Sequence, residues 1–341
     1  MNHSRLPKRT APWLGAVLLL ASLLLLLLGA LVGSTGLDSA LHLGHDAMAW
    51  QIVWDIRLPR TAGAWAAGAL LGLAGALAQG LFRNPLADPY LLGSASGAAL
   101  GVALASVLFG LSPFAGHWLT RLGLSGAAFG GATLAVLLTL LLAQGVQHTL
   151  RLLLAGVIVG VVLGALASLV MLLAPEVMQG MQSFMLGSTG FVDWGVSVLM
   201  AVIWIVCMVL AWMLSHALDS LSLGEDTAAS LGLPLPQMRA ALVAVLALAT
   251  GTAVAQTGLI AFVGLAAPHL VRALAKVTHG RLIWLSSLMG AVLLMAADLL
   301  ARGLLAPREL PVGVLTAVLG GGYLLWLMHG GSRSSLGSIR E

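Results

Sequence analysis

Residues 150–173 read LRLLLAGVIVGVVLGALASLVMLL, and this stretch decides the class of fold. It carries one charged side chain, Arg151, near its start. A transmembrane helix needs ~20 predominantly apolar residues, so the stretch can cross a bilayer as a helix. A strand of an outer-membrane barrel would instead alternate between apolar and polar residues with a period of two. The pattern therefore predicts a membrane-spanning helix.

The composition extends this prediction to the whole chain. Of its 341 residues, 60% are hydrophobic and 8% are charged, whereas an average soluble domain has ~25% charged residues. So few charges cannot cover the surface of a soluble globule, and a single cysteine cannot form an internal disulfide. These values exclude a soluble enzyme, a disordered chain and a secreted disulfide scaffold. They predict an all-α polytopic membrane protein with one transmembrane domain over residues 1–341.

Ten apolar runs are candidate membrane helices. They cover residues 13–33, 61–82, 91–111, 122–144, 150–173, 192–215, 238–256, 258–275, 281–304 and 311–329. With the N-terminus in the cytosol, five basic residues fall outside and the other eleven of the 16 lysines and arginines fall inside; the five are Arg57, Arg60, Arg121, Arg302 and Arg308. Cytosolic loops carry an excess of lysine and arginine, so both termini are predicted to be cytosolic.

The segment 240–271 fits this topology least well. It must cross the membrane twice, which leaves ~24 Å of helix per crossing for a hydrocarbon core of ~30 Å. Gly251, Gly258, Gly264 and Pro268 interrupt it. Broken helices persist at membrane depth only where protein or a water-filled cavity surrounds them. We therefore expect this segment to line a pathway or to pack against another subunit.

Catalytic, nucleotide-binding and metal-binding signals are weak. Neither lysine, Lys8 nor Lys276, follows a glycine, so the chain has no P-loop and an ATP-driven process would need another chain. The run GSASG at 93–97 has alanine where the G-x-S-x-G motif places its nucleophile. His42 and His45 have no third ligand nearby that would support a metal site. The basic residues lie between apolar runs, which indicates membrane topology rather than nucleic-acid binding.

Two inside segments have helix and turn signals. Within residues 216–239, Ser222 and Glu225 have the spacing of a capping box, which predicts a short cytosolic helix. This helix could dock a soluble partner, or the segment could be an ordinary re-entry loop. The other segment, RNPLADP at 83–89, is a tight structural turn containing Asn84 and Pro85, in which Asp88 is placed to cap the third helix and Pro89 to begin it.

The outside arginines oppose the usual charge bias. Arg57, Arg60 and Arg302 could extend toward lipid headgroups, or they could form a basic docking surface for carboxylates on a partner. Asp298 stands four residues before Arg302, so a local ion pair is a further expectation.

Glycines spaced by four form a stripe on the fifth run, and a similar stripe occupies the second run. The stripes contain Gly156, Gly160, Gly164 and Ser168, and Gly68, Gly72, Ala76 and Gly80. Small residues at this spacing let another backbone approach closely. The stripes could therefore pack helices together or line a conduit.

Several motifs, in order, resemble the FecCD-type permeases of bacterial ABC importers, which carry iron siderophores, haem or vitamin B12. They are RLPR at 57–60, Gln79 with RNPLADP at 83–89, RLLLAG at 151–156, SLGE at 222–225, GLIAFVGL at 258–265, APHLVR at 267–272, Asp298 to Arg302 and ELPVGVLT at 309–316. The likeness runs from about residue 50 to residue 328. The chain departs from the family in lacking a proline after Gly258 and in having GGGY at 320–323.

The resemblance implies a homodimeric multi-pass permease of the bacterial cytoplasmic (inner) membrane, with the type II ABC importer permease fold, ten helices and no catalysis of its own. A second copy would complete the pathway. A periplasmic binding protein would deliver the chelate, and two ATP-binding subunits would hold ATP and magnesium. The cargo stays open among the family's chelates, with iron chelates favoured by family frequency. A proton- or ion-coupled secondary transporter is the alternative from another class.

The resemblance also assigns roles to residues of this chain. The segment 219–233 would be the coupling region for the ATPase, with Ser222, Leu223, Gly224, Glu225, Asp226, Leu231 and Gly232. The residues that receive the binding protein would be Arg57, Arg60 and Arg302. The pathway and its cytosolic gate would involve His148, Thr149, Leu150, Gly156, Gly160 and Gly164.

Overall fold

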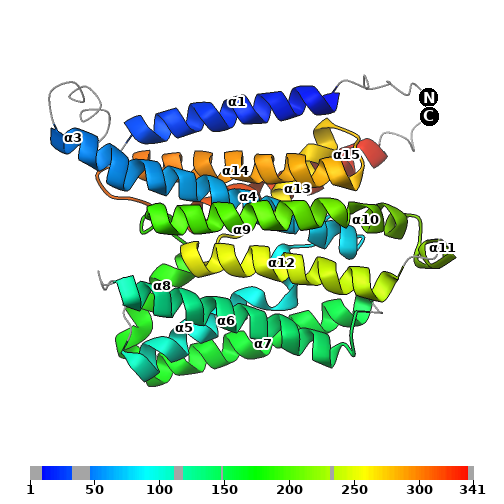
Figure 1. The fold of residues 1–341 in the computed structure, drawn as a ribbon, viewed down its shortest axis with the longest axis horizontal. Helices are drawn as coiled ribbons and strands as arrows, with labels where there is room; N and C mark the ends of the chain where they lie inside the picture. The colour runs from blue at the N-terminus through cyan, green and yellow to red at the C-terminus, as the bar shows by residue number, and fades with distance from the viewer. Residues whose placement is uncertain (1–9, 33–46, 111–117, 147–148, 231–233, 337–341) are drawn as a thin grey trace.

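The computed structural model describes residues 10–32, 47–110, 118–146, 149–230 and 234–336, and helices account for most of them (Figure 1). The long apolar helices are α1 (Thr10–Leu31), α4 (Leu58–Leu81), α6 (Trp118–Leu142), α7 (Thr149–Leu173), α9 (Trp194–Met213), α12 (Leu235–Thr257) and α14 (His279–Gly303). Three further apolar helices are α5 (Ser94–Phe109), α13 (Val263–Leu274) and α15 (Val312–Leu336). Each of the predicted apolar runs falls on one of these helices, so the all-α polytopic prediction is confirmed.

Shorter elements connect the apolar helices. They are α3 (Ala47–Ile52), the π-helix η1 (Val53–Arg57), the 3₁₀ helices η2 (Pro89–Leu92) and η3 (Pro175–Val177), α8 (Met178–Leu186), α10 (Ser215–Ser222) and α11 (Glu225–Ser230). The elements α3 and η1 run directly into α4, so the chain is helical from residue 47 to residue 81.

Helix α4 is the centre of the bundle. It packs against α14, α12, α9, α13 and α1, and almost every side chain on it is buried. A Cβ atom on Gly68 would lie 2.4 Å from the carbonyl oxygen of Gly290, and one on Gly72 would lie 2.2 Å from that of Ser286. No larger residue fits between the two backbones, so the glycine stripe of the second run packs α4 against α14.

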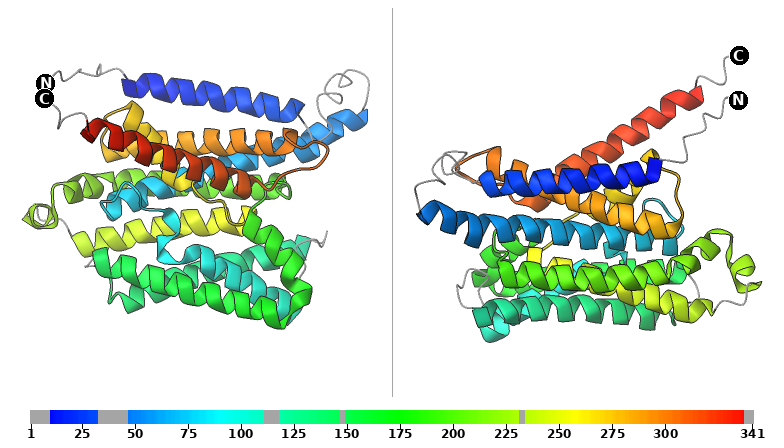
Figure 2. Two further views of the ribbon diagram at one scale, coloured as in Figure 1. Left: turned by 180° about the vertical axis from the view of Figure 1, so that it is seen from behind. Right: turned by 45° about the horizontal axis from the view of Figure 1, so that its top comes forward.

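Helices α5, α6 and α7 form a second group on the far side of α12 (Figure 1). Gly97 on α5 and Gly131 on α6 bring these two backbones into contact, because a Cβ on either would lie within 2.3 Å of the carbonyl oxygen of the other. When the bundle is seen from behind, α15 lies over the face opposite α9 and α12 (Figure 2).

The two crossings of segment 240–271 are divided differently from the prediction. Helix α12 has 23 residues and reaches ~34 Å, whereas α13 has 12 residues and reaches only ~18 Å. The expectation of a helix from residue 258 is wrong, because Gly258 and Phe262 have φ angles of +69° and +68° and hold the chain out of a helix. The shorter α13 is largely buried against α4 and α14, as a segment too short to span alone requires.

Candidate functional site

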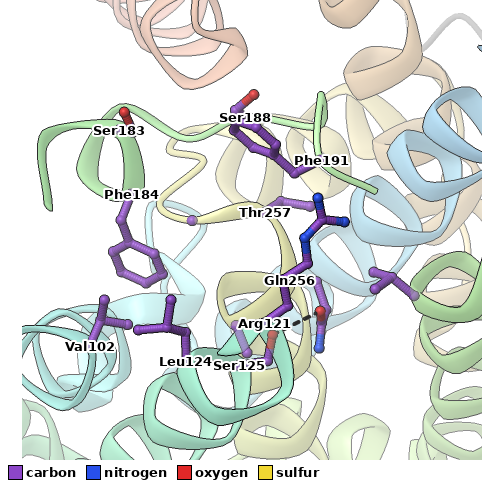
Figure 3. Close-up of a pocket in the computed structure, with 13 residues that line it drawn as sticks. Val102, Arg121, Leu124, Ser125, Ser183, Phe184, Ser188, Phe191, Gln256 and Thr257 are labelled. Carbon is purple, nitrogen blue, oxygen red and sulfur yellow. Dashed lines mark hydrogen bonds between the residues drawn. The ribbon is translucent and has the colours of Figure 1, made fainter. Parts of the chain in front are cut away.

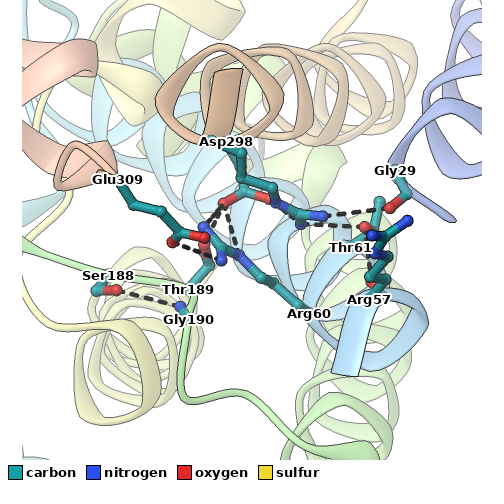
Figure 4. A network of polar contacts seen from close by, with 10 residues as sticks. Gly29, Arg57, Arg60, Thr61, Ser188, Thr189, Gly190, Asp298 and Glu309 are labelled. Atoms are coloured by element: carbon teal, nitrogen blue, oxygen red, sulfur yellow. Dashed lines mark hydrogen bonds and ion pairs between the residues drawn. The ribbon is translucent and has the colours of Figure 1, made fainter. Parts of the chain in front are cut away.

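Charged side chains close one end of the bundle, and we call them the arginine cluster (Figure 4). Arg57 and Arg60 lie where η1 passes into α4, Asp298 and Arg302 lie in the last turns of α14, and Glu309 lies in the loop before α15. They are distant in sequence, and the packing of α4 against α14 brings them together.

Asp298 is the centre of the arginine cluster and is fully buried, with 0% of the residue exposed. Its Oδ1 accepts hydrogen bonds from Nε and Nη2 of Arg60 at 3.1 and 3.0 Å and another from the hydroxyl of Thr189. Its Oδ2 pairs with Arg302, while Nη1 of Arg60 reaches Glu309 Oε2 at 2.7 Å. A buried carboxylate needs such partners because it has lost its hydration. Asp298 therefore ties together α14, α4 and the loop before α9.

Two arginines of the cluster also hold the end of α1. Nη1 of Arg57 donates to the carbonyl oxygen of Leu31 at 2.8 Å, and Nη1 of Arg302 donates to that of Gly29 at 3.3 Å. The last carbonyl groups of a helix have no partner within the helix. These guanidinium groups therefore satisfy the C-terminal end of α1.

Arg57, Arg60 and Arg302 do not extend toward lipid headgroups, because only 5%, 8% and 1% of these residues are accessible. Asp298 and Glu309 hold the guanidinium groups of Arg60 and Arg302 inward, whereas that of Arg57 bonds to the carbonyl oxygens of Ala30 and Leu31. The ion pair predicted between Asp298 and Arg302 from their spacing is confirmed.

Two members of this network escaped sequence reasoning. Glu309 stood inside a motif that we quoted, but nothing in the sequence joined it to Arg60. Thr189 lies 109 positions from Asp298 and follows no charge or spacing pattern. Only the packing of the loop before α9 onto α14 brings Thr189 to that carboxylate.

Helices α10 and α11 project at the opposite end of the bundle, the end at which α1 begins (Figure 1). The predicted capping box is wrong. Ser222 ends α10, and its hydroxyl donates to the carbonyl oxygen of Asp219 at 2.6 Å. Gly224, with a φ of +109°, separates the two helices, and α11 begins at Glu225. The predicted coupling segment is therefore two short helices joined at Leu223 and Gly224.

The link between these helices presents an apolar side chain, since Leu223 is 65% exposed. Helix α10 is anchored by Asp219, whose Oδ1 lies 2.7 Å from Nδ1 of His279 and accepts from its backbone N–H at 3.0 Å. No sequence motif predicts this contact between α10 and the start of α14. Leu231 and Gly232, two of the predicted coupling residues, lie outside the described part of the chain.

The glycine stripe of α7 faces its own chain. A Cβ on Gly156 would lie 2.1 Å from the carbonyl oxygen of Leu91, and one on Gly160 would lie 3.7 Å from Cα of Gly93. Gly164 faces α5 in the same way. These glycines pack α7 against η2 and α5, and the other side of α7 faces away from them.

That other side of α7 is apolar and exposed within the single chain. It includes Leu154 at 52% and Val161 at 68% exposure. The predicted gate lies at the start of this helix. Thr149 is its first residue, Leu150 is 70% exposed, and His148 lies outside the described residues.

The predicted turn before α5 is present. Asn84 accepts a hydrogen bond from the backbone N–H two residues later at 2.9 Å, and Pro85 is exposed beside it. The prediction that Asp88 caps the third membrane helix is wrong, because α5 begins only at Ser94. Asp88 instead caps the 3₁₀ helix η2 by accepting from the N–H of Tyr90 at 2.8 Å, with Pro89 as the first residue of η2. Burial raises the pKa of the Asp88 carboxyl, and this hydrogen bond partly opposes the shift. The turn therefore serves as a rigid connection between α4 and α5.

A bundle of apolar helices with charged or polar structures at its two ends defines a multi-pass membrane protein. Residues 16–330 match the FecCD transport family. The vitamin B12 import system permease protein BtuC of Salmonella paratyphi A is 42% identical over 282 residues, which cover 81% of this chain and 83% of that protein. BtuC of Salmonella typhimurium is 41% identical over the same length. The chain belongs to the FecCD transport family, and it is a multi-pass permease of the inner membrane.

Solved structures agree with this assignment. A transporter described as of the metal-chelate ABC type, in an inward-facing conformation, superposes with a TM-score of 0.83 at 29% identity and covers 94% of this chain and 99% of its own. The PsaBC structure from Streptococcus pneumoniae, in complex with a Fab, has a TM-score of 0.58 at 18% identity and covers 84% and 93%. The second likeness concerns the fold alone.

Proposed function

We propose that this chain is the permease subunit of an ABC importer that moves a metal chelate from a periplasmic binding protein into the cytoplasm. The cargo class is an iron siderophore, haem or vitamin B12. The observation that carries the proposal is the 42% identity to vitamin B12 import permeases over 81% of the chain. The chelate-transporter likeness, with a TM-score of 0.83, supports the same class of cargo.

In this proposal two copies of the chain enclose one pathway, and the exposed apolar side of α7 faces it. The gate lies at the start of α7, with His148, Thr149 and Leu150. Because Gly156, Gly160 and Gly164 face α5 and η2, they contribute by fixing the position of α7 rather than by touching cargo.

Two ATP-binding subunits, which hold ATP and magnesium, would grip α10 and α11. The support is geometric, since both helices project from one end of the bundle and Leu223 is exposed between them. Binding and hydrolysis of ATP on those subunits would alternate the access of the pathway. The coupling residues are Ser222, Leu223, Gly224, Glu225, Asp226, Leu231 and Gly232.

The binding protein would dock at the arginine cluster through carboxylates. Within the cluster, Arg57, Arg60 and Arg302 outnumber Asp298 and Glu309 by one, but over all the described residues of this end five arginines are balanced by five carboxylates. Since the guanidinium groups are mostly buried and the described charges of this end cancel, we propose that the cluster acts by fixing the shape of the surface on which the binding protein docks.

Transport in proteoliposomes tests this function. The purified permease is reconstituted with and without its ATPase, with labelled vitamin B12 or iron chelate and the binding protein on the outer side. We expect ATP-dependent uptake only when both subunits are present. Uptake by the permease alone that collapses with the proton gradient would instead establish a secondary transporter and would overturn the proposal.

A further inference from the structure

A groove runs along the outside of the bundle between α6 and α9. Both helices pack against α12, but among the described residues they make little contact with each other. The groove has a volume of about 290 Å³, and its walls include Leu122, Gly126, Phe129, Leu199, Ile203 and Leu248. The groove is therefore largely apolar, and α12 forms its floor.

Gly126 keeps this groove open. It is exposed on α6, and a Cβ built on it would meet nothing within 4 Å. The wall residues Leu122 and Leu199 are 57% and 45% exposed. In a membrane-spanning bundle, such a surface faces hydrocarbon rather than water. The depth from Leu122 to Phe129 is ~10 Å along the helix, most of one half of a ~30 Å hydrocarbon core.

Polar side chains appear at the end of the groove that lies toward the arginine cluster. The groove continues into a smaller cavity of about 130 Å³ and shares Ser125, Ala255 and Gln256 with it. Ser125 donates to Oε1 of Gln256 at 3.2 Å and so joins α6 to α12 at this junction. The side chain of Arg121 extends from α6 toward the loop that carries Phe191 (Figure 3). The apolar groove therefore ends at a mostly apolar cavity that is lined by one cation, Arg121.

Arg121 has capacity to bind an anion. Its side chain is 42% exposed, and its contact with Asp193 is 3.8 Å long, beyond the length of a good hydrogen bond. Asp193 also caps α9 by accepting from the N–H of Val196 at 2.9 Å. The guanidinium group has five N–H donors, and this one distant carboxylate leaves most of them for another partner.

We propose that the groove binds one acidic glycerophospholipid, with an acyl chain between α6 and α9 and its phosphate at Arg121. The lipid belongs to the outer leaflet, because Arg121 lies on the predicted outer side. Helix width excludes a polypeptide helix as the occupant, since a helix with its side chains is ~10 Å across and the groove volume is only about 290 Å³. An acyl chain is narrow enough, and the cation at the end of the groove complements a phosphate.

Native mass spectrometry of the full-length protein, titrated with phosphatidylglycerol or phosphatidylethanolamine, tests this site. We expect wild type to retain one phosphatidylglycerol more tightly than phosphatidylethanolamine. Arg121→Gln should remove this preference and weaken phosphatidylglycerol binding by about tenfold, the loss expected for one charge-assisted hydrogen bond. Gly126→Leu fills the groove and should weaken both lipids equally.

Matched controls separate the site from general effects on the protein. Arg308→Gln removes another exposed outer arginine, and Gly322→Leu adds a side chain in open space on α15, which does not line the groove. Both should bind lipid as wild type does. An unchanged lipid preference in Arg121→Gln, or a polypeptide of defined mass in place of lipid, would overturn the proposal. Because binding needs neither ATPase nor cargo, this result is independent of the proposed transport function.

Discussion

At the scale of single residues, the arginine cluster shows how charge can be kept inside a membrane protein. Arg60 and Arg302 would be costly to bury alone, and Asp298 compensates both of them. Removing one partner of a buried ion network destabilises a protein more than replacing the whole network with apolar residues, because the remaining charges stay buried without a counter-charge or hydration. The stability of this end of the bundle therefore depends strongly on one carboxylate.

Replacing that carboxylate is the first prediction. Asp298→Asn keeps the size of the side chain but leaves the buried guanidinium groups without their central charge. We expect the free energy of unfolding to fall by about 3–5 kcal/mol, measured by denaturant or thermal unfolding in detergent micelles. Asp193→Asn is the control, because it removes an exposed carboxylate whose ion pair is worth less than ~1 kcal/mol and can still cap α9. Equal losses in both variants would show that the network adds no stability.

At the scale of elements, the turn between α10 and α11 depends on one glycine. Gly224 has a φ of +109°, a conformation that residues with a Cβ rarely adopt. A larger residue there would change the angle between the two helices and move Leu223, while leaving the buried side of α10 on the bundle. The coupling segment is thus separable from the membrane fold.

This separation gives a second prediction. Gly224→Val should reduce co-purification of the permease with its ATPase by more than tenfold, while the unfolding temperature of the permease alone changes by only a few degrees. Gly145→Val is the matched control, since Gly145 also has a positive φ, +97°, and open space around it. If Gly145→Val lowers ATPase association as much, general loop strain is responsible rather than the position of Leu223.

Elements were more predictable than their ends. Every long apolar helix was visible in the sequence because hydrophobicity over ~20 residues is a local property. The division of 240–271 into α12 and α13 was not, since it depends on the positive φ of Phe262, a residue that ordinarily avoids this conformation. The capping-box prediction is wrong for a related reason. The positive φ of Gly224 separates Ser222 from the start of α11, although the S-x-x-E spacing is present.

The site was predictable to a smaller extent. Sequence motifs singled out Arg57, Arg60, Arg302 and Asp298. The i,i+4 spacing of Asp298 and Arg302 alone predicted their ion pair. Their burial could not be predicted, because it depends on Thr189 and Glu309, which approach only after the bundle is assembled.

At the scale of the whole molecule, α7 is the least buried of the long candidate spans in the described part of the chain. Only 17% of its most apolar window is buried, compared with 61% for α12 and 72% for α14. One side is fixed to α5 through glycines, and the other is a continuous apolar surface. A second copy of the chain is the partner that the proposed function requires there.

Cross-linking tests this arrangement. Cys207 is buried with 0% exposure, so a Cys207→Ala background leaves no thiol in the protein. Val161→Cys on α7 should then give a covalent dimer with a bifunctional maleimide in membranes, at high yield and independently of expression level. Val202→Cys on α9 has a similar exposure, 51%, and is the control that should remain monomeric. Dimers from the control but not from α7 would place the interface elsewhere.

The central position of α4 has a consequence for how the protein is made. Among the candidate spans of the described chain, the one containing α4 is the least apolar and the most buried, with 89% of its window covered. A segment passes from the translocon into lipid according to its own hydrophobicity. We therefore expect the span containing α4 to have the least favourable free energy of insertion by itself. The helices that cover it, α9, α12 and α14, are synthesised more than a hundred residues later. During synthesis, α4 must therefore stay protected from lipid until most of the polypeptide has been inserted. Products truncated after α7 should consequently be substrates for membrane quality-control proteases.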